Sequence, residues 1–144
     1  MLKVYLAGKM NGLSYAEMSG WRNKIYEKLN AMANFHDKKI NVVNPVLYYN
    51  FEEKRHQSEV EVEEFDLAHV VSSNIIIVNL DGLKNSIGTI IELHDAHYHH
   101  KIPVIAFGNQ ELYADLHPWI KNDITRIESN IDEMLDYIED FYLR

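Results

Sequence analysis

Two acidic residues in the sequence stand where a carboxylate could do chemistry, and the first is Glu92. It follows Gly88 by four residues, about one turn into a predicted helix that comes after a buried strand. A carboxylate there feels the positive end of the helix dipole, which favours its ionised form. Beside a ligand crevice, such a carboxylate can attack a sugar carbon as a nucleophile. The alternative is that Glu92 only stabilises the first helical turn and faces water.

The second acidic residue is Asp66. It follows Val62 by four residues and stands next to Phe65, so it lies on or beside the apolar face of another predicted helix. Carboxylates are rarely placed there without a partner. Asp66 could hold or protonate a nucleobase. It could equally cap the helix, or pair with Arg22 or His69.

A glycine-bearing turn at residues 8–12 follows the first predicted strand, where a backbone can pass close to a ligand. Gly8, Lys9 and Met10 are therefore candidate substrate-binding residues. The turn lacks the G-x-G-x-x-G fingerprint of dinucleotide sites, and the chain has no P-loop motif. A nicotinamide cofactor is therefore disfavoured, a P-loop NTPase is excluded, and no cofactor is predicted.

The segment between the central strand and the Glu92 helix offers further polar groups. Ser86 and Gly88 could present a hydroxyl and backbone N–H groups to an anion at the helix start. The alternative for Ser86 is a plain helix cap. Asp81, in the loop just before, is a further candidate for substrate binding.

Four histidines stand in the segment 94–100, which raises the question of a metal site. His94 and His97 are three residues apart, but no acidic third ligand is placed with them. The chain has no cysteine, so neither a disulfide nor a thiolate zinc site can form. A solvated helix end is the prediction here, and no metal is expected.

Composition and charge set outer limits on the function. With 144 residues, 47% of them hydrophobic, the chain suits one domain over residues 1–144. A net charge of -8 disfavours a nucleic-acid polymer as partner. The apolar run at the N-terminus is short and is interrupted at Lys3 and Lys9, so neither a signal peptide nor a membrane span is expected. The cytoplasm is the expected location.

The elements that would position these residues alternate along the chain. Strands are predicted at 3–7, 40–43, 74–80, 103–107 and 124–127, with helices from Ser14 onward, at 58–71, at 86–100 and after Ser129. This order predicts a single-domain α/β fold of the flavodoxin-like, Rossmann-type kind, a parallel five-stranded sheet in the order 2-1-3-4-5 with helices on both faces. Ligands bind such sheets at the carboxyl ends of the strands, here the segments 8–12, 44–57, 80–86 and the loop after Phe107.

Two helices have predicted apolar faces. The first is capped by Ser14, with Glu17 as the return half of a capping box, and the last is capped by Ser129. The residues expected to face the core are Met18, Trp21, Ile25, Leu29 and Met32 in the first helix, and Ile131, Met134, Leu135, Ile138 and Phe141 in the last.

Three segments together resemble the nucleoside 2-deoxyribosyltransferase family, which includes the related deoxynucleoside 5'-monophosphate N-glycosidases. They are residues 5–10 (YLAGKM), 65–67 (FDL) and 88–93 (GTIIEL). The resemblance implies that Glu92 attacks C1' of a deoxyribose and forms a glycosyl-enzyme ester. It further implies that Asp66 holds the base and handles its proton, and that Tyr5 orients Glu92 by a hydrogen bond.

The resemblance also bears on partners. It implies a small-molecule nucleoside or nucleotide and a free nucleobase as ligands, and a homo-oligomer whose sites are shared between subunits. The residue contributed across the interface is expected within 117–126, with Asn122 as the candidate.

Two departures from the family pattern keep alternatives open. The transferases carry an acid six residues before the nucleophile, where this chain has Ser86. A serine there, together with Lys9, resembles the monophosphate N-glycosidases. The pair His94-Asp95 replaces smaller residues. The sequence thus leaves a deoxyribosyltransferase as the first hypothesis, with a monophosphate hydrolase and a non-catalytic nucleotide-binding module as alternatives.

Overall fold

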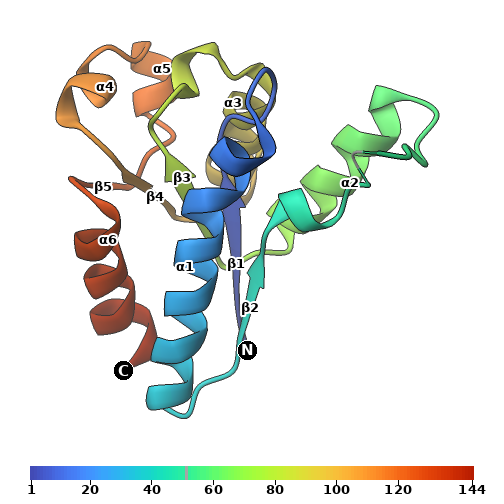
Figure 1. Ribbon diagram of the computed structural model, residues 1–144. Coiled ribbons are helices and arrows are strands. Elements are labelled where there is room, and N and C mark those ends of the chain that lie inside the picture. Colours follow the sequence, from blue (N-terminus) through green and yellow to red (C-terminus); the bar gives the residue numbers. More distant parts are fainter. Residues whose placement is uncertain (51) are drawn as a thin grey trace.

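Five parallel strands form one sheet in the computed structural model, which describes residues 1–50 and 52–144 (Figure 1). The strand order is β2-β1-β3-β4-β5, so the predicted flavodoxin-like topology is confirmed. Phe51, in the predicted loop 46–57, lies outside the described residues. The strands are β1 (Leu2–Ala7), β2 (Ile40–Val43), β3 (Ile75–Asn79), β4 (Val104–Phe107) and β5 (Arg126–Glu128).

Strand β1 pairs with β2 on one side and β3 on the other, with Tyr5 beside both Val43 and Ile76. Side chains alternate across a strand. Val4 and Leu6 therefore enter the core on one face of the sheet, while Tyr5 and Ala7 point to the other. This alternation decides which face of the sheet carries Tyr5.

Helices cover both faces, as predicted. On one face α1 (Tyr15–Phe35) and α6 (Ile131–Ile138) pack on the sheet, and on the other α3 (Ile87–His94) and the C-terminal end of α2 (Glu59–Val71) do so (Figure 1). The first helix begins as expected, because Ser14 and Glu17 form the reciprocal hydrogen bonds of a capping box. Its predicted face packs inward, with Met18, Ile25 and Leu29 fully buried and Trp21 and Met32 partly buried against the same core.

The C-terminal helix differs from the prediction in two details. Its cap is Asn130, whose side chain accepts the Glu133 N–H, while the Ser129 hydroxyl bonds the Glu133 carboxylate. After Ile138 the chain continues as a π-helix, Glu139–Leu143, which shifts the side-chain register. Leu143 is therefore buried, and Phe141, expected in the core, is 70% exposed.

The Glu92 helix is also shorter than predicted. The regular helix α3 ends at His94, and a π-helical turn at Asp95–His99 follows. Two short helices that the sequence did not indicate, α4 (Gln110–Ala114) and α5 (Pro118–Lys121), lie between β4 and β5. No helix within the described residues has the length and apolar character needed to cross a membrane.

Helix α2 stands partly away from the sheet, and its first turns project beyond the other elements in Figure 1. Val70, near its end, is its one fully buried residue, and Phe65 on its predicted apolar face is 44% exposed. Helix α2 therefore contributes little to the core and forms one wall of the space between itself and α3.

Candidate active site

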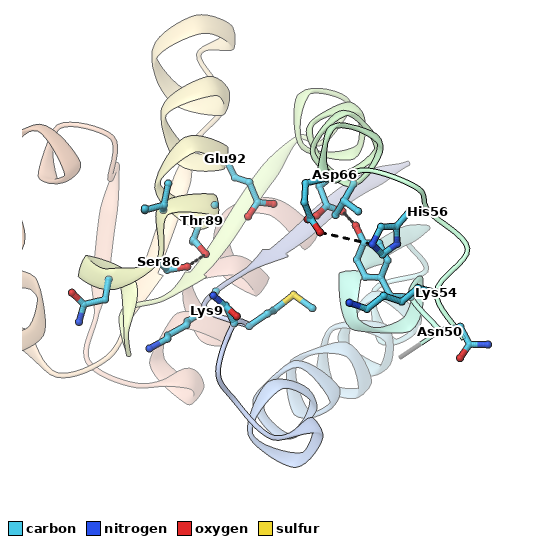
Figure 2. Close-up of a pocket in the computed structure, with 17 residues that line it drawn as sticks. Lys9, Asn50, Lys54, His56, Asp66, Ser86, Thr89 and Glu92 are labelled. Carbon is cyan, nitrogen blue, oxygen red and sulfur yellow. Dashed lines mark hydrogen bonds and ion pairs between the residues drawn. The ribbon is translucent and has the colours of Figure 1, made fainter. Parts of the chain in front are cut away.

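A pocket of about 600 Å³ opens at the carboxyl end of the sheet, between the β1–α1 turn, the start of α3 and α2 (Figure 2). A smaller groove of about 240 Å³ between α2 and α3 reaches the same two carboxylates, Asp66 and Glu92. The main pocket is lined by side chains and backbone of Gly8, Lys9, Met10, Tyr49, Lys54, His56, Glu59, Asp66, Ser86, Gly88, Thr89 and Glu92, among others.

Glu92 lies half-buried on the wall formed by α3, and its carboxylate accepts a hydrogen bond from the Tyr5 hydroxyl. Tyr5 comes from strand β1 and is buried. Burial, and after it the charge of Glu92, raises the pKa of Tyr5 far above the usual range, so the phenol stays a donor. The Tyr5 bond therefore fixes the orientation of Glu92, which is partly exposed in the pocket.

Burial also dominates the ionisation of Glu92. It raises the pKa of this carboxyl to about 7, although the Tyr5 hydrogen bond and the Arg22 charge both act to lower it. From the sequence, the helix dipole was expected to favour the ionised form, but the net effect of the surroundings is to raise the pKa. Glu92 is the sixth residue of α3, and the influence of the dipole fades beyond the first turn.

Asp66 faces the same pocket from α2, but with a different partner than expected. Its Oδ1 accepts a hydrogen bond of 2.5 Å from the Tyr49 hydroxyl. Burial raises the pKa of Asp66, while the Tyr49 bond and the His69 charge lower it. Asp66 does not cap the helix, since the cap position of α2 is Ser58. Asp66 does not pair with Arg22 either, because Arg22 points into the core on the other side of β1.

Polar groups that suit an anion gather at the start of α3. Ser86 occupies the cap position without a side-chain capping bond, and its Oγ lies 2.7 Å from Oγ1 of the buried Thr89. The Lys9 stem packs against Gly82, where a Cβ would come within 2.7 Å of Lys9 Cδ. Gly82 has a φ of 74°, a conformation that favours glycine. Lys9 is thereby held on the Ser86 side of the pocket (Figure 2).

Several lining residues were not named from the sequence, among them Tyr49, Lys54, His56 and Glu59. Figure 2 shows Lys54 and His56 on the wall beside Asp66, opposite Ser86 and Thr89. His56 and Glu59 form an ion pair of 3.9 Å. All four lie in or next to the segment 44–57, which was marked for its position after β2 but lacks any periodicity that could single out one residue.

Apart from Tyr5, which reaches the pocket only through its bond to Glu92, two predicted residues lie outside this pocket. Asp81 is exposed in the loop after β3, and Asn122 is exposed at the end of α5. The histidine segment is held by its own contacts, since His94 pairs with Asp123 at 2.9 Å and His97 Nδ1 lies 3.2 Å from the Ile102 carbonyl. Among the described residues, no group of three or more histidine, aspartate or glutamate side chains is arranged to hold a metal.

Comparisons with known proteins identify the fold. No family model and no curated protein sequence matches the chain. Among solved structures, a conserved protein from Enterococcus faecalis V583 is similar with a TM-score of 0.74 and 20% identity, over 97% of this chain and 98% of that one. A 2-deoxyribosyltransferase from Bacillus psychrosaccharolyticus is similar with a TM-score of 0.65 and 19% identity, over 96% and 91%. The chain thus has the fold of a 2-deoxyribosyltransferase, as the sequence resemblance predicted.

Replacing Tyr49 by phenylalanine should raise the pKa of Asp66 by about one unit or more. A hydrogen bond to a charged group is worth about 1.5–3 kcal/mol, and one pKa unit corresponds to about 1.4 kcal/mol. The measurement is a carbon-13 NMR titration of the Asp66 carboxyl. Tyr48→Phe is the matched control: it keeps the ring that stacks on His69 and removes only a hydroxyl, so it should leave the titration unchanged. An unchanged Asp66 titration in Tyr49→Phe would show that the bond is not formed in solution.

Proposed function

We propose that this protein cleaves the N-glycosidic bond of 2'-deoxynucleosides and transfers the deoxyribosyl group to an acceptor base. The observation that carries this proposal is the pair of carboxylates in one pocket, each held by a tyrosine. Tyr5 donates to Glu92 and Tyr49 donates to Asp66. The fold shared with a 2-deoxyribosyltransferase supports the same function.

In the first half-reaction, Glu92 attacks C1' of the deoxyribose. The new bond joins a carboxylate oxygen to C1', the bond from C1' to the base nitrogen breaks, and its electron pair leaves with the base. Asp66 supplies the proton that the departing base needs. Because burial raises the pKa of Asp66, this carboxyl holds a proton more readily than an exposed aspartate does.

In the second half-reaction, a nitrogen of the acceptor base attacks C1' from the face that the first base has left. The ester bond breaks, Glu92 regains its charge, and the proton lost by the acceptor returns to Asp66. Two inversions restore the original configuration at C1'. Throughout, the hydrogen bond from Tyr5 keeps one oxygen of Glu92 occupied and thereby sets the direction of attack.

We further propose that the working form is a homo-oligomer that acts on small nucleosides and bases in nucleotide salvage in the cytoplasm. Asn122 is exposed and lies outside the pocket of its own chain. It is therefore available to contribute to the pocket of a neighbouring copy. The single domain, 1–144, would then carry one nearly complete site and one residue for its neighbour.

Glu92→Gln should lower kcat/KM by at least about a thousandfold, about 4 kcal/mol of barrier, because a neutral amide cannot displace the base. Steady-state rates with deoxynucleosides and a free base measure this effect. Glu64→Gln changes an exposed glutamate on α2, so this variant is the matched control and should keep full activity. A Glu92→Gln variant within tenfold of the unaltered protein would rule out Glu92 as the nucleophile.

In the unaltered protein, kcat/KM should rise with pH through about 7, because only the carboxylate form of Glu92 reacts.

A second candidate function is hydrolysis of deoxynucleoside 5'-monophosphates. The observation that favours it is the anion-compatible corner formed by Ser86, Thr89 and Lys9. Hydroxyls, backbone N–H groups at a helix start and an ammonium attract phosphate, where a carboxylate would repel it. In this case water, in place of a base, would attack the ester.

Ser86→Asp distinguishes the two functions. If this corner binds phosphate, the monophosphate should be the better substrate of the unaltered protein, and the new carboxylate should reverse that preference by tenfold or more. Rates for nucleoside and monophosphate, each with and without added base, provide the measurement. Asn34→Asp adds the same charge far from the pocket and should leave the ratio unchanged. Equal rates for both substrates, unaffected by Ser86→Asp, would exclude the phosphate corner and leave the transferase.

A further inference from the structure

Asp66 has two carboxyl oxygens, and the rest of the protein occupies only one of them. Its Oδ1 accepts the Tyr49 hydroxyl at 2.5 Å. Among the described residues, no group donates a hydrogen bond to Oδ2, although Asp66 is half-buried and lines both cavities that reach Glu92. Buried polar atoms normally have partners, so this second oxygen is the one that a ligand in the pocket can meet.

The chain that carries Tyr49 is anchored directly after β2. Asn44 is buried there and caps a short 3-10 helix, η1 (Pro45–Leu47), because its side chain accepts the Val46 N–H at 3.1 Å. Pro45 and Val46 are buried as well. The position of Tyr49, two residues beyond this turn, is therefore set from the edge of the sheet.

Ring contacts hold the same segment against helix α2. Tyr48 stacks on His69, with ring centres 5.2 Å apart and planes 8° from parallel. Tyr49 meets Phe65 at an angle, with ring centres 6.5 Å apart. Phe65 directly precedes Asp66, so the two tyrosines lie along the stretch of α2 that carries this acid. A packed ring thus brings the Tyr49 hydroxyl to Asp66.

The hydrogen bond has a direction, and that direction decides which oxygen of Asp66 holds a proton. Burial, followed by the hydrogen bond to Asp66, raises the pKa of Tyr49, so its phenol keeps its hydrogen and donates it. A neutral carboxyl carries one O–H and keeps acceptor capacity on its other oxygen. Because Oδ1 is the acceptor for Tyr49, the acidic hydrogen of a neutral Asp66 belongs on Oδ2.

We propose that Tyr49 is a positioning residue, which occupies Oδ1 of Asp66 and thereby presents Oδ2 as the oxygen that transfers a proton to the departing base. This inference rests on the proposed cleavage of an N-glycosidic bond. As the bond from C1' to the base breaks, the proton moves from Oδ2 to a ring nitrogen, Asp66 becomes a carboxylate and the base leaves neutral. Tyr49 keeps its own proton. Its hydroxyl therefore matters only for bases that need a proton to leave.

Two substrates that differ in this need isolate the role of Tyr49. The base of 2'-deoxyguanosine needs a proton to leave neutral, whereas 7-methyl-2'-deoxyguanosine already carries a positive charge on its base and needs none. Tyr49→Phe removes the hydroxyl and keeps the ring. It should lower kcat/KM by at least about tenfold for deoxyguanosine and by less than about twofold for the methylated substrate. Glu92 attacks both substrates, so its ionisation cancels in the ratio of the two rates.

Two further variants separate this role from a general structural one. Tyr48→Phe removes the neighbouring hydroxyl outside the main pocket and should leave the ratio unchanged. In an Asp66→Asn background, Tyr49→Phe should change the ratio no further, because the proton carrier is already gone. Equal losses for both substrates in Tyr49→Phe, or the same change of the ratio with and without Asp66, overturn the proposal.

An NMR measurement tests the orientation of Asp66 without any turnover. The couplings of the Asp66 β-protons should report a single side-chain rotamer in the unaltered protein and in Tyr48→Phe, and averaged rotamers in Tyr49→Phe. If the unaltered protein cleaves neither nucleoside, the proposed function fails, while the couplings still show whether Tyr49 orients Asp66. Averaged couplings in the unaltered protein, or an unchanged single rotamer in Tyr49→Phe, overturn the positioning role.

Discussion

The hydrogen bond from Tyr5 to Glu92 joins strand β1 to helix α3, and the site is built around it. Tyr5 reaches Glu92 because the alternation of β1 directs it to the α3 face, with β2 and β3 fixing its register on both sides. A one-residue slip of β1 would send Tyr5 into the opposite core. The sheet and the nucleophile therefore depend on the same register.

A buried carboxylate is reactive only if it is ionised, and this requirement sets the electrostatics of the pocket. Desolvation raises the pKa of Glu92 to about 7, which leaves it poised between its two forms near neutral pH. Tyr5 and Arg22 favour the charged form, and Asp66 opposes it. Asp66 is itself held by Tyr49, and the same two influences act on both acids: burial raises the pKa of each, and a tyrosine hydrogen bond lowers it.

The alternation of strands and helices in the sequence predicted the sheet order, and the carboxyl-end rule marked the 8–12 turn. The family resemblance, in turn, linked Tyr5 and Asp66 to Glu92. The sequence did not single out Tyr49, since the segment after β2 has no period. It suggested that the helix dipole favours the ionised form of Glu92, whereas the burial that raises the pKa depends on tertiary packing. The π-helical turns were not predicted, because no pattern in the sequence marks them. The turn at Glu139–Leu143 changes the register of Phe141.

The central claim is that Glu92 forms a covalent bond to the sugar, and the most direct test is to isolate that ester. The protein is mixed with a deoxynucleoside in the absence of acceptor base, quenched with acid within the first turnover, digested, and measured by mass spectrometry. The account predicts one deoxyribosyl adduct, on the peptide that contains Glu92. Rapid base release with no adduct, or an adduct on any other residue, would contradict it.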